Sequence, residues 1–480
     1  MIALQQIDNQ AHLTRNQKLL VVTVVVAAAL EFFDYYIVAF VLAFITKPWH
    51  LTFGLSAVIL LSSGIGGIAG AFIWGIIADR WGRRPTFIAT ILTFSAGSVL
   101  LALTPTGAWI YLSLLRLAVG FGVGGFVVNM TFVQEFVPAR VRGFVSSLAS
   151  VFIPVGLMFG AFLGAYLAPV IGWRGMFLVG ACPAFLTLLL IFIIPESPLW
   201  LLRSGKREEA RRSIAWALQR DATEVDLGNV ILKEPPRPRL RELFRYRRSL
   251  IASWMGNLGA LTGYYGLILW LPTVLVLVLS TTAAHASALV ISLSAIGVAA
   301  RFAFGYLSDR IGRRACGFIF GIGAGILLPL AGTSASLHIG TVSLFWLLLI
   351  AAFVFADGGF AINGPYSAEL WPSHLRATGM GSAYGFGSLG KIIGPLGLAL
   401  IVGSSNFIEP AAMLGAIKPA FLYLGSWYAV AGVAYGIFGF ETKGRTYEQI
   451  DDILQHKSSV MQSARISKHD AEAATPRIEK

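Results

Sequence analysis

The feature that most constrains this chain is a series of long apolar runs that contain almost no charge. Hydrophobic residues make up 56% of the 480 residues and charged residues only 13%, whereas soluble proteins carry about 25% charged residues. A helix needs about 20 mostly apolar residues to span a bilayer. Twelve runs reach that length, at about 19–45, 55–79, 86–104, 108–136, 144–170, 174–194, 249–279, 285–308, 315–333, 340–370, 377–404 and 418–440. Barrel strands alternate in polarity and these runs do not, so the sequence predicts an all-α integral membrane protein with twelve transmembrane helices.

The net charge of +13 could indicate nucleic-acid binding, but the placement of the charges points to the membrane instead. Nearly all of the 37 Lys and Arg residues fall on the side that both termini share. The exceptions are Lys47, Arg174 and Lys418 on the other side, and Arg116, Arg301 and Lys391 inside the runs. The positive-inside rule therefore predicts cytoplasmic termini in a multi-pass protein of the cell (inner) membrane. We expect the lipid bilayer, and no nucleic acid, as a partner.

Two sequence blocks occur twice, once in each half of the chain. Gly75, Asp79, Arg80, Gly82, Arg83 and Arg84 recur at a constant offset as Gly305, Asp309, Arg310, Gly312, Arg313 and Arg314. Gly124, Gly125, Phe126, Asn129, Glu135, Pro138 and Arg142 recur as Gly358, Gly359, Phe360, Asn363, Glu369, Pro372 and Arg376. The repeats predict two equivalent halves of six helices each. Parallel halves of this kind are typical of alternating-access transporters.

The same patterns give the expected organisation along the chain. We expect a cytoplasmic N-terminal segment 1–18, a first half 19–194, a cytoplasmic loop 195–248, a second half 249–440 and a cytoplasmic tail 441–480. Within the loop, residues 199–218 have the pattern of an amphipathic helix lying on the cytoplasmic face. Residues 234–239 are Pro-rich and predict a linker. From about residue 457 the tail lacks the apolar content to fold by itself, so we expect it to be largely disordered.

The repeated motifs resemble those of the major facilitator superfamily, and the resemblance covers essentially the whole transmembrane part. Three further motifs resemble those of sugar porters: Arg116 with Gly120, Gly122 and Gly124; Pro195-Glu196-Ser197-Pro198; and Glu441-Thr442-Lys443-Gly444. The resemblance points to the broad group that holds sugar porters, organic-ion transporters and aromatic-acid or metabolite–proton symporters. It implies an alternating-access transporter with a proton as coupling ion and no other cofactor, and we expect a monomer.

Charged residues of the repeats are the candidate gate. An acid beside several arginines can pair with them, and anchoring of a loop by arginines alone would require no acid. By analogy with the superfamily, such charges hold neighbouring helices together in one access state. The predicted gating residues are Asp79, Arg80, Arg83, Glu135 and Arg142 in the first half and Asp309, Arg310, Arg313, Glu369 and Arg376 in the second.

The seventh run departs from the sugar-porter pattern. It lacks the Gln-Gln pair of that group and contains Asn257, Tyr264, Tyr265, Trp270 and Pro272 instead, which resembles organic-acid and organic-ion carriers. We therefore expect a proton-coupled symporter that imports a small organic acid, with aromatic acids among the candidates. The alternatives are a sugar or polyol–proton symporter and an organic-ion antiporter.

Ionisable residues at membrane depth are candidates for function because burying a charge there is costly. Asp34 lies roughly 24 Å along its helix from Lys18, and Glu31 shares its face of the helix. Two neighbouring buried carboxylates are expensive to ionise together, so we expect the pair to load a proton. The position resembles the acidic first-span motif of aromatic-acid symporters. Arg116 is the third predicted proton-coupling residue, and a structural ion pair of these acids with Arg116 or another core cation is the alternative.

Lys391 is the leading candidate for binding the substrate. It lies roughly 22 Å into its run among glycines, and a lone ammonium there needs a counter-charge that an anionic substrate can supply. A salt bridge to Asp357 is the alternative. Asp357 and Asn363 flank glycines in a tenth run that we expect to be a broken helix lining a cavity. The remaining predicted substrate residues are Asn257, Tyr264, Tyr265 and Tyr384.

Sequence features of enzymes are missing from the chain. It contains no Gly-x-x-x-x-Gly-Lys-Ser/Thr loop for ATP, and its seven His and two Cys show no spacing typical of a metal site. Cys182 and Cys316 both lie in or beside apolar runs, so no disulfide framework is expected. The sequence predicts a transporter and not an enzyme.

Overall fold

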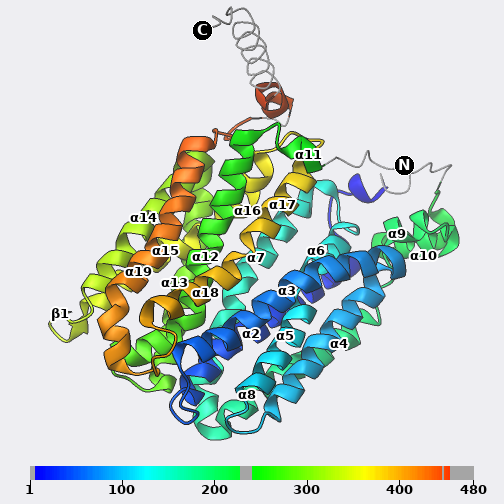
Figure 1. Ribbon diagram of the computed structural model, residues 1–480. Coiled ribbons are helices and arrows are strands. Elements are labelled where there is room, and N and C mark those ends of the chain that lie inside the picture. The colour runs from blue at the N-terminus through cyan, green and yellow to red at the C-terminus, as the bar shows by residue number, and fades with distance from the viewer. Residues whose placement is uncertain (1–5, 228–239, 446–447, 455–480) are drawn as a thin grey trace, which may run out of the picture.

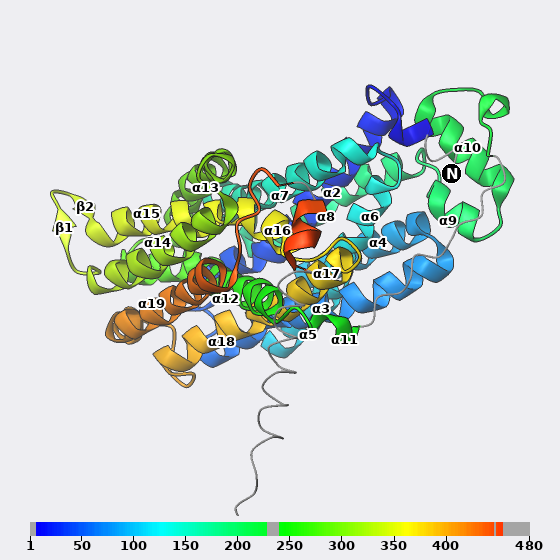
Figure 2. The same ribbon diagram turned by 90° about the horizontal axis from the view of Figure 1, so that it is seen from above.

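The computed structural model describes residues 6–227, 240–445 and 448–454, without the side chains of 182–191, of Leu240 and of several residues between 143 and 151. Its helices form two bundles side by side, one from the first half of the chain (blue to cyan) and one from the second (green to orange), as Figure 1 shows. Seen from above in Figure 2, most helices of the two bundles again lie on different sides of the molecule. The predicted all-α membrane fold is confirmed.

The first half contains seven α-helices and one π-helical turn: α2 (Arg15–Ile45), α3 (Phe53–Trp81), α4 (Arg83–Ala102), α5 (Trp109–Val123), α6 (Phe126–Gln134), α7 (Ala139–Phe162), η1 (Leu163–Leu167) and α8 (Ala168–Ile191). Between the halves lie α9 (Pro198–Arg203), α10 (Arg207–Leu218), the 3₁₀ turn η2 (Ala222–Glu224) and α11 (Leu240–Leu243).

The second half repeats this arrangement. It contains α12 (Arg247–Val278), α13 (Ala283–Ile311), α14 (Arg313–Thr333), α15 (Leu344–Gly358), α16 (Phe360–Glu369), α17 (Arg376–Gly387), α18 (Gly390–Val402), α19 (Pro410–Val433) and the π-helical turn η3 (Ala434–Phe438). A two-stranded hairpin, β1 (His338–Ile339) and β2 (Val342–Ser343), connects α14 to α15.

Eleven helical segments of the described residues are long and apolar enough to span a membrane, against twelve predicted. The difference lies in the fifth and sixth predicted spans. Helical structure continues from α7 through η1 into α8, and one apolar segment therefore covers Phe152–Ala181. Only Gly172 interrupts it, with φ 70° and ψ 171°. Glycine adopts a positive φ without strain, so the two predicted spans meet at a single residue rather than at a loop.

Glycines break two equivalent helices at equivalent places. A one-residue turn at Gly359, which itself has helical φ and ψ angles of −58° and −25°, separates α15 from α16 in the tenth predicted span. The expected broken helix that lines a cavity stays a prediction. The fourth span is divided in the same way, at Gly124 and Gly125, into α5 and α6. A Cβ atom at Gly124 would stand 2.6 Å from the carbonyl oxygen of Gly67 in α3. Small residues at these breaks therefore allow the backbones to approach closely.

The predicted amphipathic segment over 199–218 forms two helices rather than one. Gly205, with φ 76°, separates α9 from α10. The apolar face of α10 does not lie free for a membrane surface, because Ile214 and Leu218 pack against Ile7 and Leu227. Thr14, the N-cap of α2, donates its hydroxyl to the carbonyl oxygen of Ala217 at 2.6 Å. The N-terminal segment thus fixes α10 to the first half.

The helix ends form two faces of the molecule, and the contacts between the halves differ between these faces. We call the face that carries Asp79–Arg84 and Asp309–Arg314 the motif face, and the other end the opposite face. At the opposite face, the chain before α3 pairs with the chain before α19 through an antiparallel bridge between Thr52 and Phe407. Phe53 N donates to Asn406 O at 2.9 Å, and Ile408 N donates to Leu51 O at 3.1 Å. Backbone hydrogen bonds therefore join the halves at the opposite face.

Candidate functional site

Lys391 lies where the two halves meet, in the first turn of α18. Its Nζ atom is 5.4 Å from the ring centroid of Tyr265, 5.6 Å from that of Tyr384 and 5.8 Å from that of Tyr35. Tyr35 belongs to the first half and the other two rings to the second. On the backbone side, a Cβ atom at Gly64 of α3 would stand 3.1 Å from Lys391 Cβ. We call Lys391 with Tyr35, Tyr265 and Tyr384 the lysine cage.

Asp357 forms an ion pair with Arg301 and not with Lys391. Its two carboxylate oxygens accept from Arg301 at 2.8 and 2.9 Å, and both side chains are buried. The alternative that Lys391 pairs with Asp357 is therefore wrong, and Asp357 offers no free oxygen to a ligand in this conformation. Among the described residues, no ion pair within 4.0 Å involves Lys391. Its ammonium contacts the π-faces of tyrosines, which attract cations.

The two adjacent tyrosines of α12 point in different directions, as neighbours on a helix must. Tyr265 packs against Tyr35 with a ring separation of 5.5 Å, and its own ring belongs to the lysine cage. Tyr264 instead packs against Phe360 of α16 at 4.7 Å. Of the predicted aromatic residues, Tyr265 and Tyr384 reach Lys391 and Tyr264 does not. Tyr35 was missed, because it is one of four aromatic residues around Asp34 and the sequence does not show which of them faces Lys391.

Asn257 and Asn363 take part in a buried hydrogen-bond network between α12 and α16. Asn363 Nδ2 donates to Asn257 Oδ1 at 2.9 Å, and Asn257 Nδ2 donates to Ser367 Oγ at 2.7 Å. The hydroxyl of Tyr435 in η3 donates to Asn363 Oδ1. This arrangement satisfies the amides by helix–helix contacts, so a substrate role for either asparagine would require these bonds to open.

Asp34 has one satisfied and one unsatisfied oxygen. Ser98 Oγ of α4 donates to its Oδ1 at 2.6 Å, while Oδ2 is buried without a hydrogen-bond partner among the described residues. Arg116 of α5 donates to the main-chain carbonyl oxygens of Asp34 and Tyr35 at 2.7 and 2.8 Å. Arg116 therefore holds the helix turn that carries both a candidate proton site and a cage ring.

Glu31 lies one helical turn from Asp34, but it has a different hydrogen-bond partner. Its Oε1 accepts from Asn129 Nδ2 of α6 at 2.5 Å, and its Oε2 is buried without a partner. The sequence placed both acids on one helix face, and the structure gives each its own hydrogen-bond donor. Asn129 follows the break between α5 and α6, just as Asn363 follows the break between α15 and α16.

On the motif face, the candidate gating residues of the first half form one network. Arg83 pairs with Asp79 at 2.7 Å, and its Nε lies 3.6 Å from Glu135. Ser197 donates its hydroxyl to Glu135. Glu196 accepts from the backbone N–H groups of Arg83 and Arg84 at 3.0 and 3.1 Å, which satisfies free donors at the start of α4. Burial raises the pKa of both Glu135 and Glu196, and hydrogen bonds from Ser197 lower it in part.

The second half builds the same network from equivalent residues. Arg313 pairs with Asp309 at 3.1 Å and with Glu369 at 2.7 Å. Thr442 donates its hydroxyl to Glu369 at 2.6 Å, and Glu441 accepts from the backbone N–H of Arg313 at 2.9 Å. Glu196-Ser197 and Glu441-Thr442 therefore perform the same two contacts. Sequence reasoning noted both motifs but assigned them no role.

The remaining predicted gating residues lie around these networks. Arg142 donates to the carbonyl oxygen of Gln134 at 3.0 Å and pairs with Asp8 at 3.0 Å. Arg80 and Arg310 are exposed at the ends of α3 and α13, and Arg376 begins α17. Their gating role stays a prediction.

Comparisons with known proteins agree with this architecture. A family model described as "Sugar (and other) transporter" matches residues 20–454. The chain is 29% identical over 425 residues to the niacin transporter NiaP of Acinetobacter baylyi, covering 86% of this chain and 92% of that protein. It is 26% identical over 386 residues to the cis,cis-muconate transport protein of the same organism, covering 80% and 84%.

Solved structures show the same fold. The xylose transporter XylE of E. coli, in an inward-open conformation, superposes with a TM-score of 0.69 at 19% identity, covering 90% of this chain and 98% of XylE. A sequence identity of 19% with XylE is evidence for a shared fold alone. The family match covers nearly the whole chain and agrees with the paired bundles, the repeated motif-face networks and the broken helices. The chain therefore belongs to the sugar (and other) transporter family of the major facilitator superfamily, and it is a multi-pass membrane transporter rather than an enzyme.

Proposed function

We propose that this transporter imports a small organic acid together with a proton, and that Lys391 binds the acid's carboxylate. The observation that carries the proposal is the lysine cage. Lys391 is half-buried, and a positive charge at membrane depth is costly unless an anion or a polar partner compensates it. Tyrosine faces compensate part of that cost, by about 0.5–2 kcal/mol per contact. A substrate carboxylate would supply the remaining counter-charge.

The composition of the cage favours a flat, unsaturated acid. Tyr35, Tyr265 and Tyr384 present aromatic rings around the ammonium, and aromatic rings stack on one another in offset or edge-to-face arrangements. The names of two relatives agree with this chemistry, because niacin and cis,cis-muconate are both carboxylates. We infer the same substrate class here.

Asp34 is the residue that we propose to carry the coupled proton. Its Oδ2 atom has no partner and lies at membrane depth, where the ionised form is costly. The next residue, Tyr35, is part of the lysine cage, and Arg116 holds the carbonyl oxygens of both. Protonation of Asp34 removes a charge beside Arg116, and any resulting shift of that arginine moves the cage. Glu31, with its own unpartnered oxygen, is the second candidate.

The motif-face networks are the proposed gate, with that face in the cytoplasm as the positive-inside rule predicts. Arg83 and Arg313 each connect the end of one helix to an acid at the end of another within the same half. We expect these pairs to hold neighbouring helix ends together in one access state and to release in the other, as the halves rock about the substrate site.

Replacement of Lys391 tests the proposal most simply. One hydrogen bond to a charged group contributes about 1.5–3 kcal/mol, so Lys391→Ala should weaken binding of a carboxylate ligand about 10- to 150-fold. Lys391→Arg should retain part of the affinity. Lys418→Ala, which removes an exposed lysine of α19, should bind like the wild type. Affinities can be measured by ligand-induced thermal stabilisation of purified protein.

Amide analogues of the ligand complete this test. The amide should bind the wild type less tightly than the acid, and it should bind Lys391→Ala as well as it binds the wild type. If acid and amide respond alike to the mutation, Lys391 does not bind a carboxylate. If an uncharged sugar proves to be the tightest ligand, the organic-acid proposal fails.

A further inference from the structure

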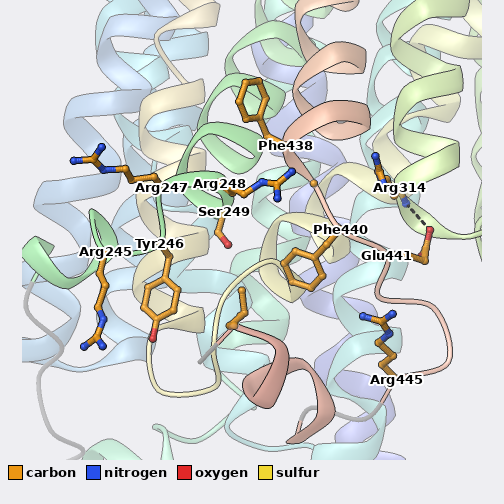
Figure 3. Close-up of a pocket in the computed structure, with 12 residues that line it drawn as sticks. Arg245, Tyr246, Arg247, Arg248, Ser249, Arg314, Phe438, Phe440, Glu441 and Arg445 are labelled. Atoms are coloured by element: carbon orange, nitrogen blue, oxygen red, sulfur yellow. Dashed lines mark hydrogen bonds between the residues drawn. The ribbon is translucent and has the colours of Figure 1, made fainter. Parts of the chain in front are cut away.

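A pocket of about 420 Å³ lies on the motif face of the second half, away from the lysine cage. Figure 3 shows its lining. It is bounded by the start of α12, the start of α14 and the chain that follows η3. The spans Arg247–Val278, Arg313–Thr333 and Pro410–Phe438 each have one end at this pocket. The pocket therefore lies at the boundary between the membrane and the water on the motif face.

The lining of the pocket is strongly basic. Five arginines line it, namely Arg245, Arg247, Arg248, Arg314 and Arg445, against one acid, Glu441. Glu441 is already occupied, because its carboxylate accepts from the backbone N–H groups of Arg313, Arg314, Thr442 and Lys443. The side chains of Arg247, Arg248 and Arg445 are exposed.

Within the described part of the chain, no ion pair involves Arg247, Arg248, Arg314 or Arg445. Arg314 donates to the carbonyl oxygen of Gly436 at 2.6 Å, and Arg248 approaches that of Ile437 at 3.4 Å. Each guanidinium has five donors, so both arginines keep donors for a ligand. The positive-inside rule explains arginines on this face, but it does not require them to line one pocket.

Apolar surface adjoins the arginines. Phe438, Phe440 and Leu454 contribute to the lining. Two apolar side chains adjacent to lining residues in the sequence, Phe244 and Ile437, are 58% and 56% exposed. An anion that binds here would thus have guanidinium groups on one side and exposed apolar surface close by.

We propose that this pocket binds the phosphate of an anionic phospholipid, whose acyl chains lie along the outer surface of the second half. Guanidinium groups match phosphate oxygens in geometry and charge. Basic pockets between helix ends at a membrane boundary are suited to lipid headgroups. The exposed apolar side chains give the acyl chains a surface that a soluble phosphate would not use.

Lipid binding to the purified, delipidated full-length protein tests the proposal. Native mass spectrometry should show that phosphatidylglycerol binds the wild type more tightly than phosphatidylcholine. A basic residue near the surface strengthens binding of anionic lipid about fivefold, so Arg248→Gln with Arg445→Gln should weaken phosphatidylglycerol binding about 25-fold. Phosphatidylcholine binding should not change.

A matched control removes two other arginines, which lie in the segment between the two halves. Arg212→Gln with Arg220→Gln should bind phosphatidylglycerol like the wild type, because both side chains are exposed on α10 or just after it and do not line the pocket. Equal losses in both double variants, or no loss in the pocket variant, would overturn the proposal. If inorganic phosphate bound as tightly as the lipid with the same arginine dependence, the ligand would be a soluble anion and the lipid assignment would be wrong. Among the described residues, the Arg445 side chain makes no hydrogen bond and no ion pair. Arg445→Gln alone should therefore fold and show the fivefold loss even if the double variant fails to fold.

Discussion

At the scale of single residues, the structure distinguishes two acids that the sequence could only group. Asp34 lies beside Ser98 and Arg116, and Glu31 lies beside Asn129. Only Asp34 is adjacent in sequence to a ring of the lysine cage. The α2 backbone at Asp34 and Tyr35, which Arg116 holds, therefore links the residue that we propose to carry the proton to the proposed substrate site.

Asp34→Asn should abolish accumulation of substrate and leave substrate exchange intact. Asparagine keeps an oxygen that can accept from Ser98, but it cannot load and release a proton, so binding and rocking persist without coupling. Glu31→Gln provides the comparison, and we expect it to retain accumulation. Both activities can be measured in proteoliposomes with and without an inward proton gradient. Gradient-driven accumulation by Asp34→Asn would show that another residue carries the proton.

The residues of the site were only partly predictable. Lys391, Asp34 and Arg116 were identified because a charge inside an apolar run is rare and costly. The partner of Asp357 could not be identified from the sequence, because the sequence contains several cations at membrane depth and does not show which of them lies near Asp357. Tyr35 could not be distinguished from other aromatic residues, since most of them only pack. Which face of a helix meets the other half is a property of the tertiary structure.

At the scale of elements, the positions of the helices could be predicted from the apolar runs. The interruptions within helices could be predicted only where glycines clustered in the sequence. The break at Gly359 was expected, whereas those between α5 and α6 and between α17 and α18 were not. The fifth and sixth predicted spans meet at Gly172, where one residue with positive φ takes the place of a loop. Helix propensity and hydropathy do not report on such single-residue junctions.

The two capping glutamates give a prediction at this scale. Glu196 and Glu441 each satisfy backbone donors at the start of a helix, α4 and α14 respectively. Loss of a capping side chain costs about 1 kcal/mol. Glu196→Ala and Glu441→Ala should therefore each lower the thermal unfolding midpoint in detergent, and their effects should add because the sites are in different halves.

The control for this measurement is Glu209→Ala. The side chain of Glu209 is 58% exposed and, among the described residues, forms an ion pair only with Lys206, at 3.5 Å. Its replacement should leave the unfolding midpoint unchanged. If the capping variants were as stable as Glu209→Ala, the two glutamates would not stabilise the starts of α4 and α14. The matching contacts in the two halves would then not contribute to the stability of the fold.

At the scale of the whole molecule, the halves are joined by backbone hydrogen bonds at the opposite face. Alternating access requires that these bonds open during each cycle. Thr52 and Phe407 form the narrow kind of antiparallel pair, because the hydrogen bonds flank them. Such pairs have Cα atoms about 4.5 Å apart, which is compatible with a disulfide.

Thr52→Cys with Phe407→Cys should therefore form a disulfide under mild oxidation and stop transport, and a reductant should restore it. The two natural cysteines, Cys182 and Cys316, would first be replaced by serine. Each single cysteine variant serves as a control and should transport with or without oxidant. Full transport by the cross-linked protein would mean that the opposite face does not open during the cycle.

Proton-driven accumulation of a carboxylate tests the central claim most directly. Proteoliposomes containing the wild-type protein would be given nicotinate, muconate, nicotinamide or xylose, each with and without an inward proton gradient. We expect the gradient to drive accumulation of at least one acid above its equilibrium level, a protonophore to abolish it, and the amide and the sugar not to accumulate. Accumulation of an acid that is indifferent to the gradient would contradict proton coupling, and gradient-driven accumulation of xylose in place of both acids would contradict the assignment of an organic-acid substrate.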